Sequence, residues 1–148
     1  MIRTTTLIAA LALLAFVPGC FPEPDVGEPL AGACNPEDSD PTKEVSYGLD
    51  IQPLMDRPST EGGCSCHNAG TGAPSGFDMT SLTAMRRGGT TSGAKIIVAG
   101  DPCSSILVQK LSPSPPVGAR MPLVGPPYWT AEEQQLIRDW IAEGAKNN

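Results

Sequence analysis

The stretch Gly63-Cys64-Ser65-Cys66-His67 places two cysteines within the three residues before the only histidine of this 148-residue chain. A single histidine is most often structural, but this one follows a cysteine pair. Thiolates and imidazole nitrogens are the protein ligands that soft metals and metal cofactors prefer. The order of the residues is one position short of the pattern C-x-x-C-H. The stretch therefore predicts a site that holds a prosthetic group or a metal ion.

C-x-x-C-H is the attachment sequence of c-type haem, in which both thiols add to vinyl groups and the histidine ligates the iron. In this chain Cys66 keeps its place beside His67, whereas Cys64 is one residue too close. Residues two apart on a helix face different sides. Helical geometry therefore favours a single thioether through Cys66, with Cys64 either attached through a distorted turn or released for a disulfide.

The part of the chain around this motif predicts an all-α domain of three to four short helices joined by long loops. The best strand signal, residues 95–98, is too short to form a sheet alone. Tyr47, Ile51 and Leu54 recur at helical spacing, and Pro53 is tolerable within a first turn. A short helix after Thr80 is expected to stop at Gly88.

Two further helices have capped starts. Asp101-Pro102 predicts an N-cap followed by proline at the first helical position, with the helix ending before Pro113. Thr130-Ala131-Glu132-Glu133 fits the capping box, and Gly144 is a natural stop. Between these two capped starts lies a stretch rich in glycine and proline that carries Met121.

The N-terminal residues predict export and a lipid anchor. Residues 1–19 resemble a lipoprotein signal peptide, with an apolar run that ends at Val17-Pro18-Gly19-Cys20. Cys20 is then the lipidated residue, and the alternative is an ordinary signal peptide with a stray cysteine. Residues 20–46 are rich in proline and acidic residues and predict an extended tether. The folded domain is expected to span residues 47–148.

These motifs occur in an order that resembles a class I c-type cytochrome domain, in particular the planctomycete-type cytochrome c branch. The resemblance covers roughly residues 45–146 and includes Gly100-Asp101-Pro102, Arg120-Met121-Pro122 and the final capped helix. It implies a small cytochrome c-like helical shell around one covalent haem c. The iron ligands that it implies are His67 and Met121, and Cys64 and Cys66 are the attachment residues.

The remaining cysteines leave two pairings open. An exported domain is expected to oxidise its thiols. If both motif cysteines hold haem, Cys34 pairs with Cys103. If only Cys66 does, Cys64 is the preferred partner of Cys103, and Cys34 is left over in the tether. A zinc site that uses Cys64, Cys66, His67 and Cys103 is a minor alternative.

The expected function is that of a lipid-anchored mono-haem cytochrome, which carries single electrons between redox partner proteins of the bacterial envelope. The anchor would hold it on a periplasmic or outer-membrane face, and it would be no enzyme. A haem-free lipoprotein that acts as a structural or binding module is the alternative. A net charge of −6 and the lack of a basic stripe argue against nucleic acid. Side chains suited to the haem propionates are Arg86, Arg87 and Arg120.

Overall fold

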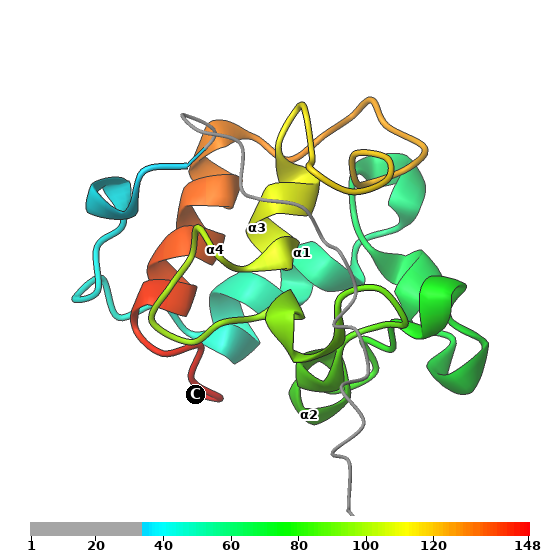
Figure 1. The fold of residues 1–148 in the computed structure, drawn as a ribbon, viewed down its shortest axis with the longest axis horizontal. Coiled ribbons are helices and arrows are strands. Elements are labelled where there is room, and N and C mark those ends of the chain that lie inside the picture. Colours follow the sequence, from blue (N-terminus) through cyan, green and yellow to red (C-terminus); the bar gives the residue numbers. More distant parts are fainter. Residues whose placement is uncertain (1–33) are drawn as a thin grey trace, which may run out of the picture.

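The computed structural model describes residues 34–148 (Figure 1). The expected signal peptide, the anchor at Cys20 and the first part of the tether lie outside the described residues. Within residues 34–148 the structure is helical and contains no strand, as the all-α prediction requires. None of the helices in this range is long and apolar enough to cross a membrane.

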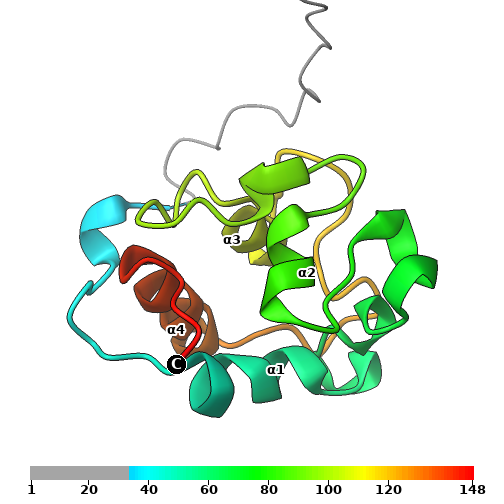
Figure 2. The ribbon, with the colours of Figure 1, turned by 90° about the horizontal axis from the view of Figure 1, so that it is seen from below.

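The described chain contains four α-helices, a π-helical turn and a series of single 3₁₀ turns, all joined by loops. The π-helical turn, Tyr47–Ile51, runs directly into the first α-helix. In Figures 1 and 2, α4 lies beside this turn and also beside α3. The helices are α1 (Gln52–Asp56), α2 (Leu82–Arg87), α3 (Ile106–Leu111) and α4 (Ala131–Ala142).

One part of the core lies where the Tyr47–Ile51 turn meets α4. The ring centroids of Tyr47 and Trp140 are 5.5 Å apart, and the indole Nε1 of Trp140 donates to the carbonyl of Lys146 at 2.8 Å. Ile51 and Ile137 are fully buried in the same cluster. Burying such large side chains typically contributes about 1.5–3 kcal/mol each, so this contact holds the two ends of the domain together.

Three of the predicted helices are confirmed. Pro53 lies in the first turn of α1, where its missing N–H costs little. The helix after Thr80 is α2, and it ends at Gly88 with a φ of 70°. Both hydrogen bonds of the capping box at Thr130 and Glu133 are present at the start of α4.

The predicted start of the third helix is wrong. Asp101 is not its N-cap, because the Asp101 carboxylate accepts a hydrogen bond from the Ser104 N–H at 3.0 Å and closes a separate turn. α3 begins only after Ser105, whose hydroxyl bonds backbone groups of Val98 and Asp101. The Asp-Pro pair therefore marks a turn that precedes the helix.

The folded domain begins earlier than predicted, because residues 34–46 are joined to it at several points instead of forming a free tether, although most of these residues are exposed. Cys34 and Cys103 form a disulfide with Cα atoms 5.5 Å apart. The Asp40 N–H donates to a carboxylate oxygen of Asp139 at 2.8 Å, and Val45 is only 2% exposed. The prediction of a tether rested on the proline and acidic content of the segment, which carries no information on contacts with distant residues.

Removing this disulfide should destabilise the domain. The bond joins residues 69 positions apart. A cross-link of that span lowers the conformational entropy of the unfolded chain and so stabilises the fold by about 2–4 kcal/mol. Replacement of both Cys34 and Cys103 by serine should lower the free energy of unfolding by about that amount in urea titrations. An unchanged unfolding midpoint would show that residues 34–46 do not belong to the cooperative unit.

Candidate functional site

The Cys-Ser-Cys-His motif forms one tight turn that is fixed to the end of α1. Ser65–His67 is a single 3₁₀ turn, and Cys64 is its N-cap with φ −112° and ψ 17°. The Cys64 N–H donates to the Met55 carbonyl at 2.9 Å, and the Ser65 N–H donates to the Arg57 carbonyl at 3.3 Å. These bonds make the C-terminal end of α1 the support on which the motif rests.

Gly63 makes this close approach possible. A Cβ atom at this position would lie 2.0 Å from the carbonyl oxygen of Arg57 and 2.5 Å from its Cβ. Contacts under 3.0 Å are essentially never tolerated, and backbone cannot move aside as the end of a side chain can. The need for glycine here is therefore steric. It does not come from the backbone conformation, because the φ of Gly63 lies outside the left-handed region.

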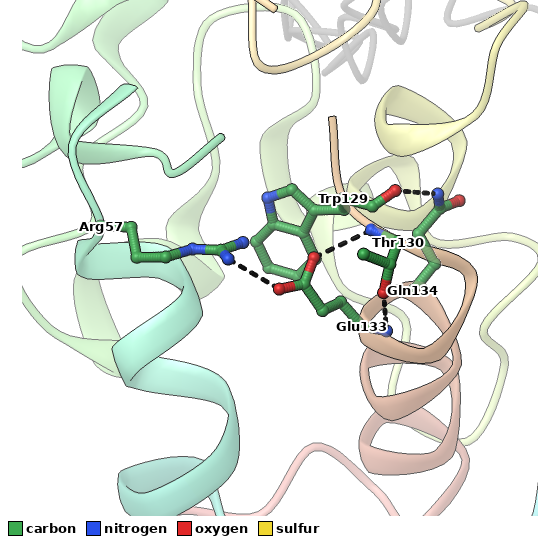
Figure 3. A network of polar contacts seen from close by, with 5 residues as sticks. All are labelled: Arg57, Trp129, Thr130, Glu133 and Gln134. Atoms are coloured by element: carbon green, nitrogen blue, oxygen red, sulfur yellow. Dashed lines mark hydrogen bonds and ion pairs between the residues drawn. The ribbon is translucent and has the colours of Figure 1, made fainter. Parts of the chain in front are cut away.

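Arg57 also links the motif to α4 (Figure 3). Its guanidinium donates to Glu133 at 2.6 Å and lies 5.8 Å from the centre of the Trp129 ring. Glu133 is the same residue whose carboxylate accepts from the Thr130 N–H in the capping box. One arginine thus joins the end of α1, the motif turn and the start of α4.

A cavity of about 430 Å³ opens beside the motif. Ligand sites commonly have volumes of roughly 300–1,000 Å³. The cavity wall includes all four residues that are predicted from the sequence to bind a cofactor: Cys64, Cys66, His67 and Met121. Much of the remaining wall is apolar, with Phe77, Met79, Ile96, Ile106, Leu107, Leu111, Val117, Pro122, Leu123 and Val124.

The His67 ring is held in one orientation. Its Nδ1 lies 3.0 Å from the carbonyl oxygen of Phe77, and its ring centroid lies 5.0 Å from that of Phe77. Because a carbonyl only accepts, Nδ1 carries the proton and Nε2 keeps a free lone pair. Burial lowers the pKa of His67 and favours this neutral form. An imidazole so oriented by a carbonyl is the usual arrangement of a metal-binding histidine.

The two motif thiols reach the same cavity, although they are two residues apart. Cys64 precedes the helical turn, so the rule that such residues face different sides of a helix does not apply to it. Cys64 is half-buried against the core, and burial raises the pKa of its thiol to about 12. Cys66 is exposed, and neither cysteine forms a disulfide.

The pairing preferred under a single thioether, Cys64 with Cys103, is wrong, because Cys103 is bonded to Cys34. The same bond removes Cys103 from the four-residue zinc set. In residues 34–148 no group of three or more His, Cys, Asp or Glu side chains is arranged to hold a metal ion. What the motif does provide is two thiols and one imidazole on the wall of a single cavity.

The cationic side chain on the cavity wall is Lys110, which the sequence did not single out. Arg86 donates to the Ala145 carbonyl, and Arg87 lies 3.9 Å from the Asp78 carboxylate. Arg120 stacks on Tyr128, 3.8 Å from the ring centre. Within the described residues none of the three arginines lines the cavity. The available signal for Lys110 was a single charge within the apolar run of α3.

Comparisons of the chain with protein-family models, with characterised proteins and with solved structures found no match.

Replacing Gly63 by alanine should disrupt the motif turn. The added methyl group would collide with the Arg57 carbonyl, and forced repacking of this kind costs about 1–3 kcal/mol. Gly72→Ala is the matched control, because its added Cβ meets no atom within 4 Å. Chemical denaturation should show destabilisation for the first variant and little change for the second. Equal stability of both variants would contradict the close approach.

Proposed function

We propose that the cavity holds one covalent haem c and that the protein is a mono-haem electron carrier. The observation that carries this proposal is the position of Cys64, Cys66, His67 and Met121 on the wall of one cavity. Met121 lies far from the motif in sequence, in the loop before α4. A helical shell of short segments around a flat cofactor would also account for the many loops.

The residues present fit such a group. The cavity has the volume of a ligand site and a largely apolar wall, which suits a porphyrin ring. His67 presents Nε2 as a free lone pair, because Phe77 holds Nδ1. Met121 would supply a neutral thioether sulfur as the second ligand, which favours ferrous iron and raises the reduction potential. Bound haem supplies reversible one-electron chemistry, and the chain tunes it.

Both thiols are available for attachment. Attachment would add the S–H bond of each cysteine across a vinyl C=C bond of the haem, so that sulfur would bond one carbon and hydrogen the other. No electrons are exchanged and no group leaves. The disulfide between Cys34 and Cys103 leaves Cys64 and Cys66 reduced, and both reach the cavity. We therefore assign two thioethers to the shortened motif.

The sequence of the first 46 residues adds the cellular setting to the proposal. A lipidated Cys20 would anchor the protein in the bacterial envelope, on a periplasmic or outer-membrane face. There the haem would exchange electrons with redox partner proteins. A haem-free structural or binding module is the competing function, and detection of haem separates the two.

Haem should stay attached to the denatured protein. On a denaturing gel, wild type should stain for haem peroxidase activity, and Cys64→Ala and Cys66→Ala should each retain some stain through the remaining thioether. The double variant should lose it. The Cys34→Ser, Cys103→Ser pair is the matched control and should keep it. Complete loss of the stain in Cys66→Ala alone would contradict two thioethers, and an unstained wild type would contradict the proposed function.

Met121 should be the second iron ligand. Methionine sulfur bound to ferric haem gives a weak charge-transfer absorption in the near infrared, and Met121→Leu should remove it and lower the reduction potential. Met55→Leu is the matched control, because Met55 is buried in the core and does not line the cavity. A wild-type protein that lacks the band and binds carbon monoxide readily would rule out this ligand.

A further inference from the structure

Lys110 occupies an unusual position for a lysine. It lies in the last turn of α3, is half-buried, and contributes to the wall of the cavity beside Ile106, Leu107 and Leu111. Burying an ammonium group among apolar side chains costs free energy unless hydrogen bonds compensate for the lost water. The partners of this ammonium group therefore indicate what the lysine does.

Those partners lie in the loop that carries Met121. The Nζ of Lys110 donates to the carbonyl of Val117 at 2.8 Å and also to the carbonyl of Ala119. In addition to these side-chain bonds, the backbone carbonyl of Lys110 accepts a hydrogen bond from the Met121 N–H at 2.8 Å. Lys110 thus contacts this loop at three points, the last of them on Met121 itself.

The loop between α3 and α4 has few means of holding its own shape. Prolines occupy positions 113, 115, 116, 122, 126 and 127, and each lacks a backbone N–H donor. Four hydrogen bonds join residues 117–121 to the end of α3, and three of them are made by Lys110. The fourth joins Arg120 Nε to the Leu111 carbonyl at 3.1 Å.

We infer that Lys110 is a positioning residue, which fixes the Val117–Met121 segment and so keeps Met121, with its thioether sulfur, on the wall of the cavity. The inference rests on the proposed function for the role of that sulfur, but the clamp itself involves only this chain. Hydrogen bonds from a charged donor are stronger than neutral ones, which suits a segment that cannot form a helix or a sheet. Gly118 lies close to the ammonium group, because a Cβ atom added to Gly118 would be 3.2 Å from the Lys110 Nζ.

The test compares Lys110→Met with wild type in the full-length protein as purified. Methionine keeps the length and apolar character of the side chain and removes the donors. Lys43→Met is the matched control, because Lys43 is exposed and lies outside the cavity wall. The first readout is hydrogen exchange at the Met121 amide, which requires no haem. The second is the near-infrared band of the ferric protein together with carbon monoxide binding by the ferrous protein.

In Lys110→Met, the Met121 amide should exchange at least about tenfold faster, as expected when bonds to a charged donor are lost. The band should weaken and carbon monoxide binding should increase, while Lys43→Met matches wild type in both readouts. Unchanged exchange at Met121 in Lys110→Met would overturn the inference, whatever the haem content. A protein without haem but with faster exchange would support the clamp and contradict the proposed function instead.

Gly118→Ala tests the same clamp from the side of the loop if Lys110→Met does not fold. Its Cβ would crowd the ammonium group, and its φ of 59° disfavours any side chain. This variant keeps the lysine and should also speed exchange at Met121 and weaken the band. Wild-type exchange and an undiminished band in Gly118→Ala would count against Lys110 as the positioning residue.

Discussion

The site depends on the contact between the backbone of Gly63 and the carbonyl of Arg57. This contact lets the motif turn lie against the end of α1, where Met55 and Arg57 accept its N–H groups. Arg57 is in turn paired with Glu133 at the start of α4, so the turn is supported by both helices that bound the core. The thiols and the imidazole therefore lie on a turn that contacts from both helices support, as a preorganised site requires.

The position of this turn brings both thiols of the shortened motif to one cavity. In a continuous helix, thiols two residues apart would diverge. Here Cys64 precedes the turn and Cys66 lies within it, and both line one cavity. Elsewhere on the wall of the same cavity, the loop that carries Met121 is hydrogen-bonded to Lys110 at the end of α3. The motif turn is thus hydrogen-bonded to the end of α1 and the Met121 loop to the end of α3, and both attachments involve backbone carbonyls.

What the sequence could predict was local, and what it could not predict depends on distant contacts. The capping box at Thr130 and the stop at Gly88 follow from residues within one turn, and both are present. The pairing of Cys34 with Cys103 and the packing of residues 34–46 involve partners far along the chain, which composition does not reveal. The four cofactor candidates were predicted from the order of the motifs. Lys110 was missed, because a single charge within the apolar run of α3 is a weak signal, and the loop carbonyls to which it donates leave no pattern in the sequence.

The most direct test of haem attachment through both motif cysteines is the absorption spectrum of the unfolded, reduced protein in alkaline pyridine. Pyridine replaces the protein ligands, so the α-band position reports only how many vinyl groups remain conjugated with the ring. Two thioethers saturate both vinyl groups, and the band should lie at the short-wavelength position of a fully substituted haem c. A band at the position of haem with one or two intact vinyl groups would contradict attachment through both Cys64 and Cys66. The absence of any haem spectrum would contradict the electron-carrier function itself.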